Sequence, residues 1–193
     1  MSDEGLREHR LSSTQVLAGH FLQVFRDEVA LPDGKQTVRE YILHPGAVMV
    51  IPMLETARGL ELVLERQFRY PVGQVMLEFP AGKLDPGEEP LVCAQRELRE
   101  ETGYVAQQWA KAGVLHPVIS YATECIEIWF AKGLQAGQRD LDEGEFLEVF
   151  TATPAEIMQW CRDGRITDAK TLSGALWLSQ VLAGAWDLDW VQA

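Results

Sequence analysis

The chain has 193 residues, of which 47% are hydrophobic and 24% charged, and its formal net charge is −12 at pH 7. This composition predicts a globular fold with one sizeable core and excludes a disordered chain. The acidic balance argues against a nucleic-acid-binding protein, because such proteins place Lys and Arg against phosphates. A phosphate-bearing small substrate would need a cation between its charge and the carboxylates, so phosphate chemistry here should be metal-dependent.

The sequence also bears on the compartment. The start, MSDEGLREHR, lacks the apolar core of a signal peptide, and no run approaches the roughly 18 apolar residues of a membrane span. Cys93, Cys125 and Cys161 are odd in number and lack a metal-type pairing such as CxxC, which favours reduced thiols. We therefore expect a cytoplasmic protein with no membrane contact.

The amino-terminal part predicts a small β unit over residues 12–43. Its segments 20–30 and 37–43 are rich in Val, Phe, Tyr, Ile and Leu, and between them lies the turn sequence Leu31-Pro-Asp-Gly-Lys35. Pro presets φ and Gly accepts φ > 0, so this sequence predicts a hairpin. The unit is too small to bury much surface alone, so it should lean on the rest of the chain or on a second copy. We expect residues 1–43 to form a dimerisation unit and residues 44–193 a second domain.

The rest of the chain alternates loosely between strand and helix patterns. Strands are predicted over 47–54, 60–68, 74–79 and 125–131. Thr153, Pro154 and Glu156 have the spacing of a capped helix start, with Gly164 near its end, and a second helix is predicted from Asp168 to about residue 184. A mixed sheet with helices, in an α/β or α+β domain, is the expected fold class.

A further helix is predicted between Pro90 and Gly103. Pro90 fits its first turn and Gly103 the position just past its end. Leu91, Ala94 and Leu98 recur at i, i+3 and i+7, which gives one apolar face for packing on the sheet. The helix is therefore anchored independently of its charges.

Three carboxylates crowd this helix. Glu97 and Glu101 are four residues apart and share a face, with Glu100 beside them. Like charges at this spacing cost about 0.2–0.5 kcal/mol per pair in water, so helix stability does not require them. A hard divalent cation reverses the sign of that interaction, and Arg96 can orient the carboxylates. The alternative reading is a solvated acidic face.

The whole segment carries a specific pattern. It reads G-x5-E-x7-R-E-L-x-E-E-x-G-Y from Gly82 to Tyr104. This resembles the Nudix box, the signature of hydrolases that cut nucleoside diphosphates linked to another group. Tyr104 is the one departure, since the family more often has an aliphatic residue there. Asp85-Pro-Gly87 permits a sharp turn before the helix, and Glu88 can brace it.

Similarity to one branch of this family extends along nearly the whole chain. Residues 21–34, 39–52, 66–69 and 77–83 resemble the ADP-ribose pyrophosphatase and nucleoside diphosphate sugar hydrolase branch. The resemblance implies an α/β/α Nudix fold with a mixed sheet, an amino-terminal β unit exchanged within a homodimer, and a site near the dimer interface.

The resemblance also implies a metal site. Ala81 should offer its carbonyl, Glu97 and Glu101 should be side-chain ligands, and Glu100 is a candidate additional ligand. In this branch the general base lies on a later loop, here the acidic segment 140–149. We assign Glu143 as base and Glu145 as a further metal ligand, and the reverse assignment remains open. A solvated acidic loop is the alternative for this segment.

The same resemblance suggests substrate-binding residues. Arg69 matches the branch's phosphate-binding arginine, and a guanidinium can bind two phosphate oxygens at once. Arg66 begins the same run. Glu124 lies where the branch has a substrate-loop glutamate, and Tyr121 could stack on a base or sugar, although both also fit structural roles. ADP-ribose hydrolases typically have a Pro on this loop, whereas this chain has Ile-Ser-Tyr at 119–121, which favours broader nucleoside diphosphate sugars.

The resulting hypothesis is a Mg²⁺-dependent pyrophosphatase, with Mn²⁺ as the other candidate ion. Its substrate would be ADP-ribose or another nucleoside diphosphate sugar, split into a nucleoside monophosphate and a sugar phosphate. Two alternatives remain: a house-cleaning nucleoside triphosphate pyrophosphatase, and a catalytically silent nucleotide-sugar sensor. A sensor would be expected to have lost box carboxylates, and this chain keeps them.

Overall fold

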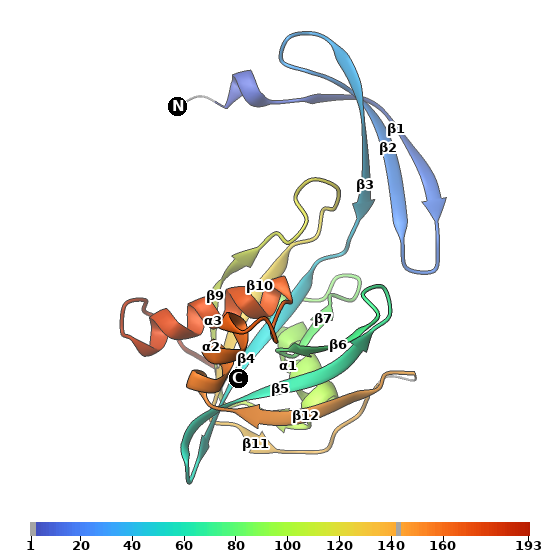
Figure 1. The fold of residues 1–193 in the computed structure, drawn as a ribbon. Helices are drawn as coiled ribbons and strands as arrows, with labels where there is room; N and C mark the ends of the chain where they lie inside the picture. Colours follow the sequence, from blue (N-terminus) through green and yellow to red (C-terminus); the bar gives the residue numbers. More distant parts are fainter. Residues whose placement is uncertain (1–2, 142–143) are drawn as a thin grey trace. The chain divides into compact units, whose positions relative to one another are not determined.

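The computed structural model describes residues 3–141 and 144–193, which divide into two units (Figure 1). One unit contains residues up to Gly46 together with Val118–Cys125, and the other contains Ala47–Pro117 and Ile126–Ala193. Each unit has its own internal hydrogen bonding.

The first unit is a three-stranded antiparallel sheet in the order β1-β2-β3. Its elements are the short 3₁₀ helix η1 (Glu4–Leu6), β1 (His9–Ala18), β2 (Gln23–Ala30) and β3 (Gln36–Leu43). The predicted hairpin is confirmed: the Leu31 N–H donates to the Lys35 carbonyl at 2.7 Å, and Gly34 has a φ of +82°. The β unit begins at His9 rather than at residue 12, because the polar residues of β1 pair with β2 while their side chains stay exposed.

The second unit is built on an eight-stranded sheet. Six strands run in the order β12-β5-β4-β10-β9-β13, while β6 pairs with β5 and β7 with β4. The strands of this unit are β4 (Ala47–Thr56), β5 (Gly59–Arg69), β6 (Gln74–Glu78), β7 (Ala81–Lys83), β8 (Tyr104–Val105), β9 (Gln108–Leu115), β10 (Ile126–Lys132), β11 (Gln135–Ala136), β12 (Leu147–Ala152) and β13 (Val191–Gln192). The β4–β10 pair is parallel and the other pairs of this sheet are antiparallel, so the predicted mixed sheet is confirmed.

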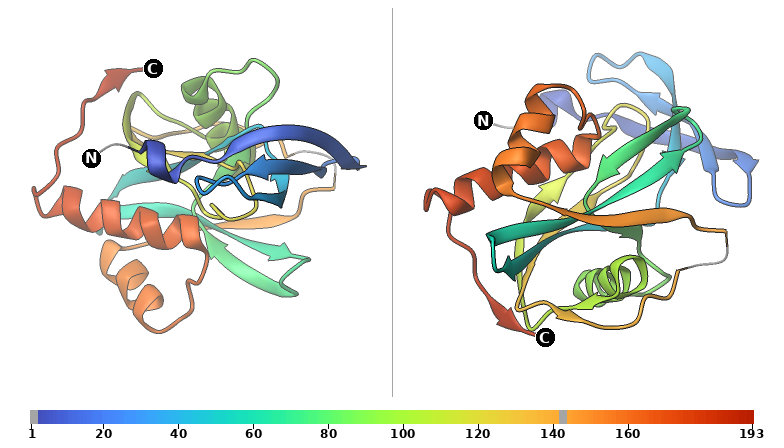
Figure 2. Two further views of the ribbon diagram at one scale, coloured as in Figure 1. Left: turned by 90° about the horizontal axis from the view of Figure 1, so that it is seen from above. Right: turned by 60° about the horizontal axis from the view of Figure 1, so that its bottom comes forward.

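Helices cover both faces of this sheet, giving the expected α/β/α layers (Figure 2). They are α1 (Pro90–Thr102), α2 (Pro154–Arg162) and α3 (Ala169–Leu182). Val48 and Val50 of β4 pack with the apolar face of α1, whereas Met49 and Ile51 pack in the cluster that includes residues of α2 and α3. A strand buried on both faces requires the continuous apolar run that the sequence shows at 47–54.

The helix ends follow the predicted signals. Pro90 occupies the first turn of α1, and Gly103 ends it with a φ of +76°. Thr153 and Glu156 form a reciprocal capping box at α2, and the Asp168 side chain accepts the Thr171 N–H at the start of α3. Caps of this kind contribute about 1 kcal/mol each. None of the described helices is long and apolar enough to cross a membrane.

Candidate metal and phosphate site

The charges of Glu65, Glu97 and Glu145 all act on Glu101, so these groups lie within electrostatic range of that residue, and we refer to the four carboxyl groups of Glu65, Glu97, Glu101 and Glu145 as the carboxyl layer. Leu62 and Leu64 of β5 pack in the cluster on the α2/α3 side. Because side chains alternate along a strand, Glu65 and Gln67 face the α1 side. The Gln67 amide donates to Glu145 Oε1 at 3.3 Å, which connects the segment before β12 to this face. Residues far apart in the sequence thus form one acidic site.

Strand β7, which contains Ala81 and Gly82, lies against Glu97 and Glu101. The Ala81 N–H donates to Glu101 Oε2 at 3.0 Å, so the Ala81 peptide touches the carboxyl group with which it was predicted to share a cation. A Cβ added at Gly82 would come within 1.9 Å of Glu97 Cδ and Oε1. Only glycine leaves room for the Glu97 carboxylate at this position.

The predicted brace by Arg96 is confirmed. Its guanidinium donates to both carboxylate oxygens of Glu88 at 2.9 Å, to Glu97 at 2.7 Å and to Glu100 at 3.2 Å. It also donates to the Lys83 carbonyl at 3.1 Å, which ties the loop to the helix. The fork geometry of arginine allows these simultaneous bonds, and lysine would not reproduce them. Glu100 also binds Arg99, so it is ion-paired on two sides.

Burial and like charge raise the pKa values of three carboxyl groups of this layer, those of Glu65, Glu97 and Glu101. Burial is the main cause that raises the pKa of Glu65 to about 8, with the negative charge of Glu78 adding to it. Burial likewise raises the pKa of Glu97 to about 7, although Arg96 opposes this rise. The pKa of Glu101 lies well above its usual range because of burial and then the charge of Glu65. Charged carboxylates in this layer therefore require a counter-charge.

Arg69, the predicted phosphate-binding residue, belongs to an ion-pair network next to the carboxyl layer. Its Nε and Nη2 bind both oxygens of the buried Glu78 at 2.7 and 2.8 Å. Lys170 also donates to Glu78, and it binds Asp168 at 3.0 Å. Burial raises the pKa of Glu78, but these two cations outweigh burial and hold it below its ordinary value. The network fixes the Arg69 guanidinium, with Nη1 not engaged by Glu78.

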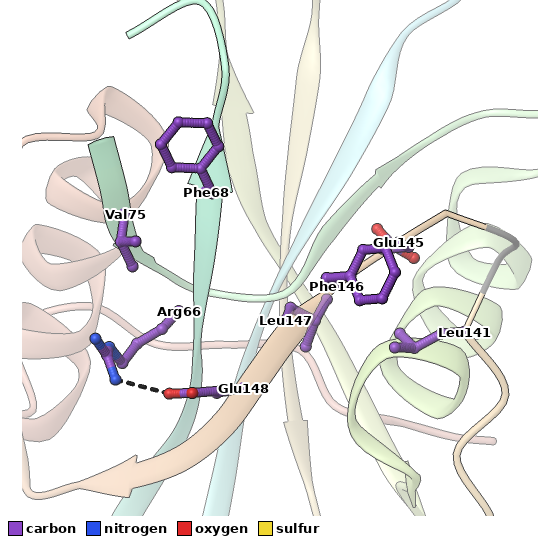
Figure 3. Close-up of a pocket in the computed structure, with 8 residues that line it drawn as sticks. All are labelled: Arg66, Phe68, Val75, Leu141, Glu145, Phe146, Leu147 and Glu148. Atoms are coloured by element: carbon purple, nitrogen blue, oxygen red, sulfur yellow. Dashed lines mark hydrogen bonds and ion pairs between the residues drawn. The ribbon is translucent and has the colours of Figure 1, made fainter. Parts of the chain in front are cut away.

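A pocket of about 400 Å³ adjoins the carboxyl layer through Glu145 (Figure 3). Arg66, the other predicted arginine, lies on its wall and is paired with Glu148 at 2.7 Å. Phe68 and Phe146 are both more than half exposed and give the pocket an apolar side. The remaining lining residues are Val75, Leu141 and Leu147. Such a mixed surface suits a ligand with both a charged and an apolar part.

Two predicted substrate residues lie in the first unit. Glu124 Oε1 is 3.7 Å from His44 Nε2. Tyr121 is 55% exposed, and its carbonyl accepts the Ile42 N–H at 2.8 Å. This bond and the one from the Thr123 N–H to the Ile42 carbonyl at 3.0 Å anchor the loop 118–125 to β3. The predicted base, Glu143, lies outside the described residues.

Three residues near the predicted site were not anticipated: Glu65, Glu78 and Lys170. Glu65 and Glu78 face each other in the β5–β6 register. For Glu65 the signal in the sequence is a glutamate within a strand otherwise rich in buried residues, which indicates either an ion pair or a functional group. In β6, Glu78 is the one buried residue, so that strand gives no such signal. Lys170 lies 92 positions from Glu78, so no local pattern links the two.

The donor set fits a hard divalent cation. Carboxylate oxygens are its preferred ligands, and the buried like charges of the layer favour its binding. Among residues 3–141 and 144–193, no three His, Cys, Asp or Glu side chains already lie in a metal-ligating arrangement. Arg96 and the Ala81 N–H occupy oxygens of Glu97 and Glu101. Cation binding therefore requires a reorientation of these side chains.

Gly82→Ala tests the contact between the loop and Glu97. The added methyl group would displace the Glu97 carboxylate, and we expect the affinity for Mg²⁺, measured by titration calorimetry, to fall by about 10- to 100-fold. Folding should survive because a side chain, not backbone, is displaced. Gly5→Ala is the matched control, since a Cβ there meets nothing within 4 Å. Wild-type affinity in Gly82→Ala would show that the position of Glu97 is unimportant for the cation.

Comparison with known proteins covers nearly the whole chain. The family model described as NUDIX domain matches residues 43–173, and the one described as Nucleoside diphosphate sugar hydrolase N-terminal domain matches residues 8–42. An ADP-ribose pyrophosphatase of Bacillus subtilis (strain 168) is 35% identical over 170 residues, which span 87% of this chain and 90% of that protein. A methanol dehydrogenase activator of Bacillus methanolicus is 37% identical over 175 residues, spanning 89% and 92%.

A solved structure shares the fold. The crystal structure of ADP compounds hydrolase superposes with a TM-score of 0.82 at 26% sequence identity, covering 93% of this chain and 96% of that chain. The α/β/α fold expected from the box is thus confirmed. Together with the family match over residues 43–173, these findings show that the chain belongs to the Nudix hydrolase family.

Proposed function

We propose that this chain hydrolyses the diphosphate bond of ADP-ribose or another nucleoside diphosphate sugar in the presence of Mg²⁺ or Mn²⁺. The products are a nucleoside monophosphate and a sugar phosphate. The carboxyl layer is the observation that carries this proposal, because it gathers buried and half-buried carboxyl groups that need a cation when charged, beside an arginine fixed by its own ion pair. The relatives named ADP-ribose pyrophosphatase, from Bacillus subtilis and Mycobacterium tuberculosis, support the substrate class.

Each residue has a definite task in this proposal. Glu97, Glu101 and the Ala81 carbonyl hold the cation, and Arg96 orients Glu97. When bound, the cation neutralises the diphosphate and acidifies water. Arg69 is held by Glu78 through two nitrogens, so Nη1 can donate to a phosphate oxygen without losing that ion pair.

The roles of Glu143 and Glu145 are assigned by proposal. Glu143 accepts the proton of the attacking water, and Glu145 is a further cation ligand. Glu143→Gln should then lower kcat by about 10²- to 10⁴-fold with unchanged Mg²⁺ affinity, as expected for loss of a general base. Glu145→Gln should weaken Mg²⁺ binding. A slow Glu145→Gln enzyme with wild-type Mg²⁺ affinity would reverse the two assignments.

The remaining substrate contacts are proposed for Arg66, Tyr121 and Glu124. Arg66 is available to phosphate or sugar oxygens if its exposed pair with Glu148 opens, which costs little in water. Tyr121 offers an exposed ring for stacking on a base or sugar. Glu124 can accept hydrogen bonds from sugar hydroxyls. Alanine substitution of each should raise KM more than it lowers kcat; an unchanged KM would remove that residue from the substrate site.

A substrate panel tests the proposal. ADP-ribose, GDP-mannose, UDP-glucose and an oxidised nucleoside triphosphate are incubated with the protein and Mg²⁺, and released products are separated by ion-exchange chromatography. We expect nucleoside monophosphate from at least one of the three sugar nucleotides, and none in excess EDTA. Turnover of the triphosphate alone would favour the house-cleaning reaction instead. Tight binding of a sugar nucleotide without hydrolysis would favour a sensor.

A second candidate function comes from the relative named methanol dehydrogenase activator, which is 37% identical over 89% of this chain. On this reading the chain would stimulate an alcohol dehydrogenase. Adding the protein with Mg²⁺ to a purified methanol dehydrogenase and following NADH absorbance tests it. Stimulation that disappears in Glu101→Gln would connect this activity to the carboxyl layer, and no stimulation would remove the candidate.

A homodimer is also proposed. The first unit exposes apolar side chains that a three-stranded sheet alone cannot cover, at Leu11, Val16, Leu17, Val38 and Leu43. β1 is exposed along its whole length and, within residues 3–141 and 144–193, pairs only with β2, which leaves an open strand edge. Covering such a face and edge with a second copy would stabilise it. Light scattering should give twice the chain mass of 21.7 kDa, and a monomeric mass would contradict the proposal.

A further inference from the structure

Glu65 is the most unusual carboxyl group of the second unit. It is fully buried, and neither of its oxygens has a hydrogen-bond partner among the described residues. Other buried glutamates are satisfied: Glu61 binds Arg58 and Thr151, and Glu78 binds Arg69 and Lys170. A charged carboxyl group that is buried without a partner destabilises the folded state by several kcal/mol. Such a group in a native protein therefore indicates a functional role or an absent ligand.

A third unsatisfied oxygen lies close by on the same strand. Gln67 Oε1 is buried without a hydrogen-bond partner in the described part of the chain, while its amide nitrogen donates to Glu145. Glu65 and Gln67 are two positions apart on β5, so their side chains leave the sheet on the same face about 7 Å apart along the strand. Three unpartnered oxygens, two of Glu65 and one of Gln67, therefore lie on this face of β5.

Glu65 also lies within electrostatic range of the helix carboxylates. After burial, its charge is the largest cause of the raised pKa of Glu101, and Glu145 contributes to the raised pKa of Glu65 itself. Arg69 and Lys170 offset part of this charge, but Arg69 hydrogen-bonds Glu78, and Lys170 hydrogen-bonds Glu78 and Asp168. When Glu65 is charged, its carboxylate therefore lacks a hydrogen-bonded cation among the described residues.

We propose that Glu65, assisted by the side-chain oxygen of Gln67, is an additional ligand of a divalent cation held by Glu101. Strand β5 would then supply oxygens in addition to those of α1 and of Ala81 in β7. This inference deepens the proposed function and rests on its cation site. It extends that site beyond the box to a strand whose sequence pattern gives no metal motif.

Cation binding, measured apart from hydrolysis, tests the inference. Mn²⁺ is titrated into the metal-free protein and free Mn²⁺ is followed by electron paramagnetic resonance. We expect Glu65→Gln to weaken Mn²⁺ binding by about 10- to 100-fold, or to lose one bound ion, and Gln67→Leu to weaken it less. Glu61→Gln is the matched control, because it makes the same change on the same strand and face at a glutamate whose partners are present.

Several outcomes are decisive. Wild-type stoichiometry and affinity in Glu65→Gln would overturn the inference and leave a buried acid that is neutral in the working protein. If Glu65→Gln does not fold by circular dichroism, Glu65→Asp replaces it, since it keeps the charge but withdraws the carboxylate, and it too should bind Mn²⁺ more weakly. Wild-type protein that binds Mn²⁺ but hydrolyses no member of the substrate panel contradicts the proposed function alone. Wild-type protein that binds no Mn²⁺ overturns this inference as well.

Discussion

Glu101→Gln is expected to lower kcat on the preferred sugar nucleotide by about 100- to 1000-fold. The substitution keeps the size of the side chain and its acceptor oxygen for the Ala81 N–H, but it removes a charged ligand from the proposed cation site. Cation stabilisation of a developing phosphoryl charge contributes several kcal/mol, and each 1.36 kcal/mol is a tenfold change in rate. Initial rates at saturating substrate over a series of Mg²⁺ concentrations measure the effect.

The stability of the same variant separates catalysis from folding. Burial and neighbouring charge raise the pKa of Glu101, so the neutral amide should be tolerated at least as well as the carboxylate in metal-free protein. We expect the melting temperature in EDTA at pH 7.5 to be unchanged or higher. Glu61→Gln, which changes a buried glutamate outside the carboxyl layer, should retain most activity. If Glu101→Gln keeps most of its activity, Glu101 does not belong to the site.

The elements that the sequence predicted well are those with strong local signals. α1 combines Pro90, Gly103 and an apolar face, so its ends could be placed to within a residue. β4 is an uninterrupted apolar run, and the β2–β3 turn contains Pro-Asp-Gly. Where the turn residues and the hydrophobic period agree, the local sequence is sufficient to predict the type and the ends of an element.

The strands that were not predicted lack such agreement. β9 has the sequence Gln-Trp-Ala-Lys-Ala-Gly-Val-Leu, in which small and charged residues break the alternation. Gly113 is needed there because a Cβ would meet the Trp177 ring at 2.7 Å, a contact set by tertiary packing. β12 follows directly on an acidic segment, so the sequence pattern at its start resembles a charged loop and the six-residue strand was not predicted. Pairing with β5 defines it.

The candidate site shows the same division. Glu97, Glu101 and their brace by Arg96 follow from helix spacing and from the resemblance of one continuous segment. The contributions of β5 and α3 come from strand register and from long-range contacts, as with Glu65 and Lys170. Spacing along a chain reports neighbours on one helix face, but it carries no information about which side chain a distant strand places opposite.

The stability of the metal-free protein is expected to decrease as pH rises from about 4.5 to about 8. The folded pKa is about 8 for Glu65 and about 7 for Glu97, against an ordinary value of 4.5, and that of Glu101 is raised as well. In this window the folded chain holds more protons than the unfolded chain, so raising the pH favours unfolding. The loss should be of the order of a few kcal/mol. Denaturant unfolding in EDTA at several pH values measures it.

A divalent cation should reverse this trend, because it replaces the protons as the counter-charge of the carboxyl layer. We expect saturating Mg²⁺ to raise the free energy of unfolding clearly at pH 8 and little at pH 5, with NaCl at matched ionic strength as the control for screening. Glu78 and Glu88 have lowered pKa values, so they change the free energy of unfolding only at pH values below about 4.5, which is outside this window. Glu65→Gln should flatten the decline in EDTA. A metal-free stability that stays constant or rises between pH 5 and 8 would show that these carboxyls are not buried together in solution.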